Sequence, residues 1–142
     1  MNIKRINEED SRIGSFINEE FLSYAEQNNV DSNYDDFCFI AESDDGEILG
    51  VITGRAYYNE VHIGDLIVDK RYRRSGLGSR LVNAVECEYS NKGYDKITLT
   101  TFGFQAPEFY KKLGYELEFI RKDPDPKLCK YFYSKPMGSI NQ

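Results

Sequence analysis

The sequence has few of the residues that hold metal ions and disulfides. Its 142 residues include one histidine and three cysteines, Cys38, Cys87 and Cys129. These cysteines lack the paired spacing of zinc sites, so we expect no metal. Because their number is odd, we interpret them as reduced thiols in the protein core, as is typical of the cytoplasm.

Long hydrophobic runs are absent, and so is tryptophan. No apolar run approaches the roughly 20 residues of a membrane-spanning helix. The chain does not open with a basic and then apolar leader. We therefore expect a cytoplasmic protein that does not bind membranes. The length fits a single domain over residues 1–142 with its own hydrophobic core.

The net charge of −6 is unevenly distributed. Residues 8–47 carry thirteen acidic side chains and one basic one, Arg12, whereas residues 69–80 carry five basic side chains and one acidic one. The basic segment suits a phosphorylated ligand, and the acidic segment suits a cationic substrate or simply keeps the protein soluble. An acidic chain of this kind is not expected to bind nucleic acid.

Hydrophobic spacing and turn residues predict a mixed α/β (α+β) fold, with helices packed on the faces of one sheet. The tail from Pro136 is expected to be loose. Gly50 and Gly54 predict a bend or bulge in the strand that contains them. The expected elements are a strand over 2–6, a helix capped by Asn7 or Asp10 and ending near 27, strands 37–42, 48–58 and 61–68, a helix closed at 92–93, a strand 95–102, a helix 107–114, and strands 115–120 and 129–135.

One stretch, residues 66–79, combines an apolar strand, a basic turn, two glycines and the start of a helix. This order is typical of a phosphate-binding loop, because glycines let the backbone approach a ligand and the helix points N–H groups at it. The GxxxxGK[ST] loop is absent, and the GxGxxG fingerprint fails because Leu81 stands at its third glycine. A fold that binds NAD or ATP remains an alternative.

The string Arg73-x-x-Gly76-x-Gly78 resembles the [Q/R]-x-x-G-x-[G/A] motif of the GNAT superfamily of acyl-CoA-dependent N-acetyltransferases. Residues 100–115, which contain Gln105, Ala106 and Phe109-Tyr110-Lys111-Lys112-Leu113-Gly114-Tyr115, resemble the second signature of that family. The order of elements also matches the family over nearly the whole chain. The resemblance implies a mostly antiparallel sheet of six to seven strands, with strands four and five (61–68 and 95–102) splayed apart.

The resemblance also implies where acetyl-CoA binds. In the family, the glycine loop binds the pyrophosphate, and the splayed strand pairs through its backbone with the pantetheine arm and polarises the acetyl carbonyl. Gln105 stands where the family commonly has an asparagine that bonds the pantetheine. Tyr110 has the place of the general acid, although an aromatic residue packed on the sheet is the alternative. The implied cofactor-binding residues are Leu66, Ile67, Val68, Arg73, Arg74, Ser75, Gly76, Leu77, Gly78, Ser79, Gln105 and Tyr110.

The general base is open. Many relatives place a glutamate two or four residues before the position of Leu66, where this chain has Gly64 and His62. His62 is suited to take a proton near neutral pH, although a packed strand histidine is the alternative. Glu60, Asp65 and a water chain are the other candidates, and Asp65 could instead fix a bulge in its strand.

The implied function is transfer of an acetyl group, or a longer acyl group, from acyl-CoA to an amine in a ternary complex. We expect a small cationic acceptor beside the acidic segment. Many members of the family dimerise, so the resemblance also allows a homodimer. A non-catalytic acyl-CoA-binding or regulatory module of the same fold is the alternative. The expected walls of the acceptor site are Tyr24, Tyr34, Phe37, Tyr57 and Tyr58.

Overall fold

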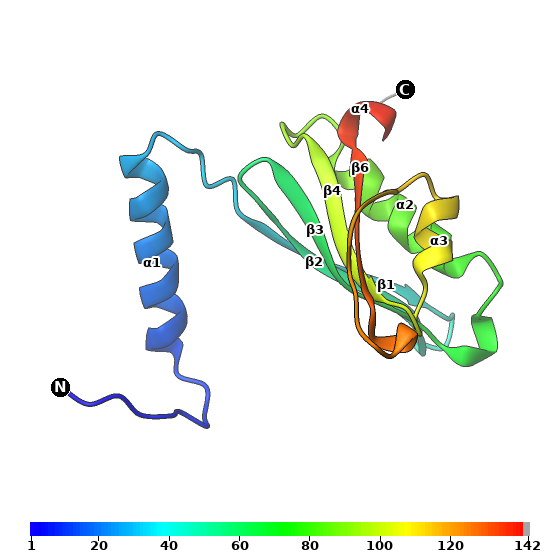
Figure 1. The fold of residues 1–142 in the computed structure, drawn as a ribbon, viewed down its shortest axis with the longest axis horizontal. Helices are drawn as coiled ribbons and strands as arrows, with labels where there is room; N and C mark the ends of the chain where they lie inside the picture. The colour runs from blue at the N-terminus through cyan, green and yellow to red at the C-terminus, as the bar shows by residue number, and fades with distance from the viewer. Residues whose placement is uncertain (141–142) are drawn as a thin grey trace. The chain divides into compact units, whose positions relative to one another are not determined.

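The structure is a computed structural model that describes residues 1–140. The chain divides into two compact units, residues 1–32 and the part from Asn33 onward (Figure 1). The domain expected over 1–142 thus includes two residues, 141 and 142, that lie outside the described part. Among the described residues, none of the helices combines the length and the apolar character needed to cross a membrane.

The first unit contains the helix α1 (Ser11–Gln27). Asp10 caps it, because its carboxylate accepts a hydrogen bond from the Arg12 N–H at 2.9 Å, so the predicted cap and helix end are confirmed. The strand predicted over residues 2–6 is wrong, since residues 1–10 form no strand. Ile3 and Ile6 are three positions apart and would point to opposite faces of a strand, which would leave no apolar side to bury.

The second unit is built on a six-stranded sheet with the order β1-β2-β3-β4-β6-β5 (Figure 1). A mixed sheet flanked by helices is therefore confirmed. Alternation in the sequence sets the two faces: along β4, Ile97, Leu99 and Thr101 are buried, while the residues between them are only half-buried. The strands are β1 (Asp35–Glu42), β2 (Ile48–Tyr57), β3 (Glu60–Val68), β4 (Lys96–Phe102), β5 (Glu116–Arg121) and β6 (Lys130–Pro136).

Among the strand pairs of the described residues, β3 and β4 form the parallel one. They pair only where Glu60–His62 lie beside Lys96–Thr98, and then they separate. From Ile63 to Val68, β3 keeps its ladder with β2 alone. The predicted splay between these two strands is confirmed, and it leaves one backbone edge of β3 free.

A bulge interrupts the β2–β3 ladder between Thr53 and Gly54, as the glycine suggested. A Cβ at Gly54 would lie 2.2 Å from the His62 carbonyl oxygen, so only glycine fits this close approach. Opposite it, Thr53 donates a hydrogen bond from its hydroxyl to the Asp65 carboxylate at 3.3 Å. Asp65 therefore contacts the bulge, which agrees with the alternative that it fixes a bulge in its strand. The extra residue, Gly64, changes which side chains of β3 face the core.

The helices α2 (Leu77–Tyr89) and α3 (Pro107–Lys112) supply the other side of the core. Their apolar residues pack with the inward side chains of the sheet into one cluster. The end predicted for α2 was three residues late: the helix stops at Tyr89, and Gly93, with φ 91°, belongs to the following turn. The largest fully buried side chains of the core are Tyr89, Ile52, Ile97, Leu99, Val61, Val82 and Val85.

The prediction of a loose tail from Pro136 is wrong for the part that the structure describes. Pro136 ends β6, and Met137–Ile140 form a short helix, α4. The Met137 N–H donates to the Asp95 carbonyl at 2.7 Å, and its side chain is buried. Residues 141 and 142 of the predicted tail lie outside the described residues.

The interpretation of the cysteines as core thiols is also wrong. Cys38 and Cys87 are exposed, and Cys129 is half-buried; all three are free thiols. Cys38 follows the buried Phe37 on β1, so alternation turns it to the opposite face. No cluster of three or more residues able to hold a metal ion occurs among residues 1–140.

Candidate active site

The glycine loop connects the free edge of β3 to the start of α2. A short 3-10 turn, Lys70–Tyr72, follows the strand, and Arg74 then takes a positive φ of 64°. Gly76 has φ 86° and is the residue before α2, which begins without a side-chain cap in the described structure. The first N–H groups of α2 are therefore available to an anion, at the positive end of the helix dipole.

The two glycines of the motif have different roles. A Cβ at Gly76 would meet no atom within 4 Å, so this position is open, and its positive φ favours glycine. A Cβ at Gly78 would lie 3.2 Å from the Phe109 ring. Gly78 thus allows α2 and α3 to approach closely, while Gly76 keeps the loop clear for a ligand.

The basic residues of the loop are not equivalent. Arg71 pairs with the carboxylates of Asp69 and Glu47, and its hydrogen bonds hold the pKa of Asp69 at about 2. Arg73 donates from Nε to the Val68 carbonyl at 3.3 Å, which ties the loop to the end of β3. Arg74 is exposed. Arg71 therefore holds the loop in place, and Arg73 and Arg74 remain as candidates to bind phosphate.

The residues expected to hold the pantetheine lie along the splayed part of β3. Leu66 and Val68 pack against the core, while Ile67 points to the other face and is 62% exposed. All three pair with β2 through one edge of their backbone. Their other edge has no ladder with β4, so backbone donors and acceptors are left for an extended ligand.

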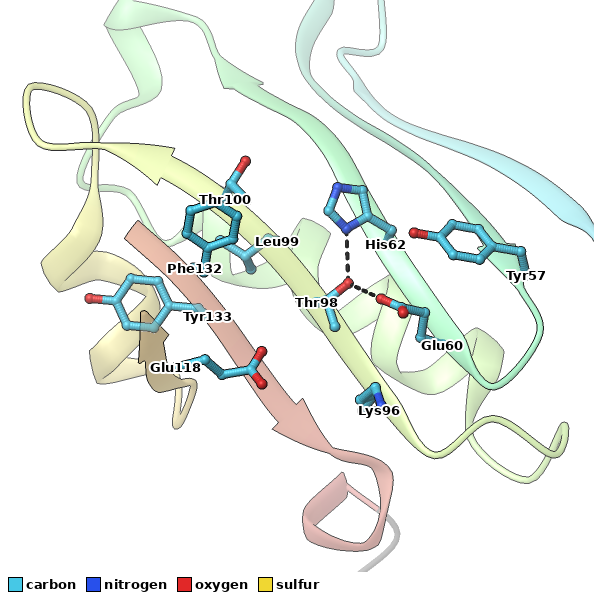
Figure 2. Close-up of a pocket in the computed structure, with 10 residues that line it drawn as sticks. All are labelled: Tyr57, Glu60, His62, Lys96, Thr98, Leu99, Thr100, Glu118, Phe132 and Tyr133. Atoms are coloured by element: carbon cyan, nitrogen blue, oxygen red, sulfur yellow. Dashed lines mark hydrogen bonds between the residues drawn. The ribbon is translucent and has the colours of Figure 1, made fainter. Parts of the chain in front are cut away.

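A pocket of about 330 Å³ opens where β3 and β4 begin to separate (Figure 2). It brings together residues from β2, β3, β4, β5 and β6. Most of them belong to the sheet face opposite the core, whereas Leu99 and Tyr133 belong to the core. Carboxylates, aromatic rings and one imidazole line it, so it can hold a ligand that is both polar and partly apolar. Its lining residues are Tyr57, Glu60, His62, Lys96, Thr98, Leu99, Thr100, Glu118, Phe132 and Tyr133.

His62 lies in this pocket and is bonded to β4. Its Nδ1 lies 2.8 Å from the hydroxyl oxygen of Thr98, which in turn donates to the Glu60 carboxylate at 2.6 Å (Figure 2). Burial lowers the pKa of His62, against the opposing effect of Glu60 and with a small contribution from Lys130. The imidazole is therefore neutral at pH 7, the form in which it can accept a proton.

Tyr110 stands on α3 behind the sheet and does not line the pocket. It is 7% exposed, and its ring packs against Phe109, Tyr115 and Tyr133. Burial raises its pKa to about 12, so it stays protonated at neutral pH. The structure does not bring Tyr110 and His62 together in one pocket. Tyr133 lines the pocket, and its ring also packs against the ring of Tyr110.

The side-chain oxygen of Gln105 forms hydrogen bonds within its own loop. Its side-chain oxygen accepts from the Phe102 N–H at 2.9 Å and lies 3.4 Å from the Thr101 hydroxyl. The amide N–H₂ group remains available as a donor. Gln105 can thus bond a ligand only as a donor in this arrangement.

Of the residues expected to form the acceptor walls, Tyr57 lines the pocket, and Phe37 is buried in the core. Phe37 was a wrong choice because its strand position faces inward. Thr98, Glu118 and Phe132 line the pocket without having been predicted as site residues. The alternation of β4 gave a signal for Thr98, since it places this polar residue opposite the buried ones.

Comparisons with known proteins agree with this geometry. The sequence profile of the acetyltransferase (GNAT) family matches residues 3–115. Blasticidin-S acetyltransferase of Streptomyces morookaense is 32% identical over 93 residues, which are 65% of this chain and 68% of that protein. The crystal structure of an acetyltransferase from Bacillus cereus is 31% identical, with a TM-score of 0.76 over 94% of this chain and 97% of that one.

A more distant neighbour is an aminoglycoside 6'-N-acetyltransferase, whose crystal structure was determined as a complex with coenzyme A. It is 22% identical, with a TM-score of 0.59 over 72% of this chain and 73% of that chain, so it is alike in fold. The family match overturns the alternative of an unrelated NAD- or ATP-binding fold, and the predicted N-acetyltransferase class is confirmed. This chain belongs to the acetyltransferase (GNAT) family.

Proposed function

We propose that this chain transfers an acetyl group from acetyl-CoA to the primary amine of a small cationic acceptor, by direct attack in a ternary complex. The observation that carries the proposal is the place of His62 in a pocket at the splay of β3 and β4, next to the free edge of β3. Burial lowers the pKa of His62, which favours the neutral form that a base needs. A base, an acceptor pocket and an edge for the donor thus lie along one strand.

The residues at the proposed donor site fit coenzyme A. The open position at Gly76 and the uncapped start of α2 suit its pyrophosphate, with Arg73 and Arg74 at hand to bind phosphate. The unpaired edge of β3 suits the amide groups of the pantetheine arm, as an added strand would. The coenzyme A complex of the aminoglycoside acetyltransferase with a similar fold supports this assignment. The residues that would hold the donor are Leu66, Ile67, Val68, Arg73, Arg74, Ser75, Gly76, Leu77, Gly78, Ser79 and Gln105.

When bound, acetyl-CoA supplies an acetyl group activated as a thioester. Backbone N–H groups of Leu66–Val68 would stabilise negative charge on the carbonyl oxygen. His62 takes a proton from the amine, so that the nitrogen can form its bond to the carbonyl carbon. Tyr110, protonated because of its raised pKa, is the candidate that gives a proton to the sulfur as the carbon–sulfur bond breaks. Acetyl-CoA is assigned as the donor ahead of longer acyl groups.

The acceptor assignment rests on the charge and rings of the pocket. Glu60 and Glu118 carry negative charge, and Tyr57 and Phe132 offer ring surfaces on which an ammonium group can bind. Lys96 is the cation among the lining residues, so two carboxylates stand against one ammonium group in the lining. Two relatives are named for acetylation of antibiotics, blasticidin-S and aminoglycosides, which supports a small-molecule acceptor.

A turnover assay with a panel of acceptors tests this function. Release of free thiol from acetyl-CoA is followed with small amines, polyamines and amino sugars, and with anionic acceptors at matched concentration. We expect amines to be preferred. Better turnover of anionic acceptors would remove the acceptor assignment, and binding of acetyl-CoA without any turnover would favour the non-catalytic module.

The role of Tyr110 is tested in the same assay. We expect Tyr110→Phe to lower kcat by roughly 10²-fold, because the sulfur loses its proton donor. Tyr131→Phe is the matched control, since it removes the same hydroxyl from a half-buried ring on β6 that lies outside the pocket lining. Equal kcat values for the two variants would make Tyr110 a packing residue.

A further inference from the structure

Three polar side chains form a chain across the short parallel ladder of β3 and β4. The ladder puts His62 beside Thr98, and Glu60 precedes His62 by two positions on the same face of β3. The Thr98 hydroxyl oxygen lies 2.8 Å from His62 Nδ1 and 2.6 Å from the Glu60 carboxylate (Figure 2). Thr98 thus connects an acid on one side to an imidazole on the other.

The hydrogen atoms of this chain can be assigned by elimination. An ionised carboxylate only accepts hydrogen bonds, so the single hydroxyl hydrogen of Thr98 goes to Glu60. The Thr98 oxygen then has no hydrogen left for His62, and it must accept one from Nδ1. A neutral imidazole with hydrogen on Nδ1 carries its lone pair on Nε2.

The orientation of the ring makes this lone pair usable. Figure 2 shows the second ring nitrogen of His62 on the side of the ring away from Thr98. The charged groups that line the same pocket are Glu60, Lys96 and Glu118. Arg55 stands opposite His62 in the β2–β3 ladder, and Glu60 and Lys130 act electrostatically on the ring. Burial lowers the pKa of the imidazole, which favours its neutral form before the reaction.

We propose that Thr98 and Glu60 are positioning residues, which fix His62 as the Nδ1–H tautomer and thereby present Nε2 to the attacking amine. This inference rests on the proposed function and specifies the atom that acts in it. In the step, Nε2 takes a proton from the amine nitrogen, a carbon–nitrogen bond forms, the carbon–sulfur bond breaks, and the Tyr110 hydroxyl gives its proton to the thiolate. The negative charge of Glu60, two hydrogen bonds away, favours the imidazolium that forms.

Because His62 is the only histidine, NMR of the imidazole nitrogens reports on it without ambiguity. We expect the wild-type protein without substrate to show the Nδ1–H tautomer above the pKa of His62. Thr98→Val, which removes the hydroxyl at nearly constant shape, should abolish this preference, and Thr98→Ser should keep it. Thr100→Val is the matched control, because Thr100 lines the same pocket but makes no bond to His62, so the tautomer should not change.

Kinetics of the same variants give a second readout. Thr98→Val should lower kcat by up to about 100-fold with little change in KM for the amine, because the general base is present but misoriented. Thr98→Ser should recover most of kcat. An Nε2–H signal in an active wild-type enzyme would overturn the positioning role of Thr98 and Glu60 but not the proposed function. A Thr98→Val protein with an unchanged tautomer would do the same. An Nδ1–H signal in a protein that transfers no acetyl group overturns the proposed function instead.

Discussion

We expect the replacement of His62 by Gln to lower kcat/KM for amine acetylation by roughly 10²–10⁴-fold, the contribution of a positioned general base. Glutamine has a similar size and can keep a hydrogen bond to Thr98, but it cannot accept a proton from the amine. The loss should therefore appear in kcat, while binding of acetyl-CoA, measured by calorimetry, stays unchanged. Steady-state kinetics on wild type and His62→Gln give the result directly.

The pH profile shows whether the loss comes from proton transfer. His62 must be neutral to act, so wild-type kcat/KM falls as the pH drops through the pKa of His62, which burial places below the ordinary value of about 6.5. In His62→Gln this acid limb disappears, and any slope that remains belongs to the acceptor. If the variant keeps the limb and nearly all of its activity, the base is Glu60, Asp65 or a water chain.

The second large effect concerns stability. Glu86 on α2 and Lys135 on β6 form an ion pair at 3.0 Å, with side chains only 11% and 15% exposed. Lys135 also donates to the Leu113 carbonyl at 2.9 Å, and the Tyr115 hydroxyl donates to Glu86 at 3.3 Å. We expect Glu86→Ala to lower the free energy of unfolding by about 3–5 kcal/mol, because it leaves a buried cation without its partner.

The same helix offers a matched control for this substitution. Glu88 pairs with Lys92 at 3.0 Å, but both side chains are about half exposed. Glu88→Ala should therefore cost less than about 1 kcal/mol. Urea unfolding followed by circular dichroism compares the two, and the double variant Glu86→Leu with Lys135→Met should recover most of the loss. Equal costs for Glu86→Ala and Glu88→Ala would show that the buried pair does not stabilise the fold.

The sequence was informative wherever a local pattern decides the structure. Residues 95–102 were correctly predicted as a strand, and the order of strand, glycines and helix around Gly76 correctly predicted the loop. The strand predicted at 2–6 failed because Ile3 and Ile6 do not alternate. The tail was misjudged because its anchor, the bond from Met137 to Asp95, joins segments far apart in the sequence.

The hydrogen-bonded chain of Glu60, Thr98 and His62 could not be predicted for the same reason. Whether Thr98 meets His62 depends on the register of the parallel ladder, and a shift by one residue would turn Thr98 to the other face. The sequence placed His62 and Thr98 on two predicted strands but contains no signal for the register between them. Likewise, the pair of Glu86 and Lys135 joins two elements 49 residues apart, and neither residue stands out in its own segment.

The central claim, that the glycine loop and the free edge of β3 bind acetyl-CoA, is tested most directly by calorimetric titration of three proteins. Wild type should bind acetyl-CoA and CoA with micromolar affinity. Ser79→Glu puts a carboxylate in the first turn of α2, where the helix dipole stabilises a negative charge. The carboxylate repels a pyrophosphate, so binding of acetyl-CoA should weaken by at least about tenfold. Ser11→Glu, the same change in the first turn of α1, should bind as wild type. No binding by wild type, or equal binding by all three, would contradict the account.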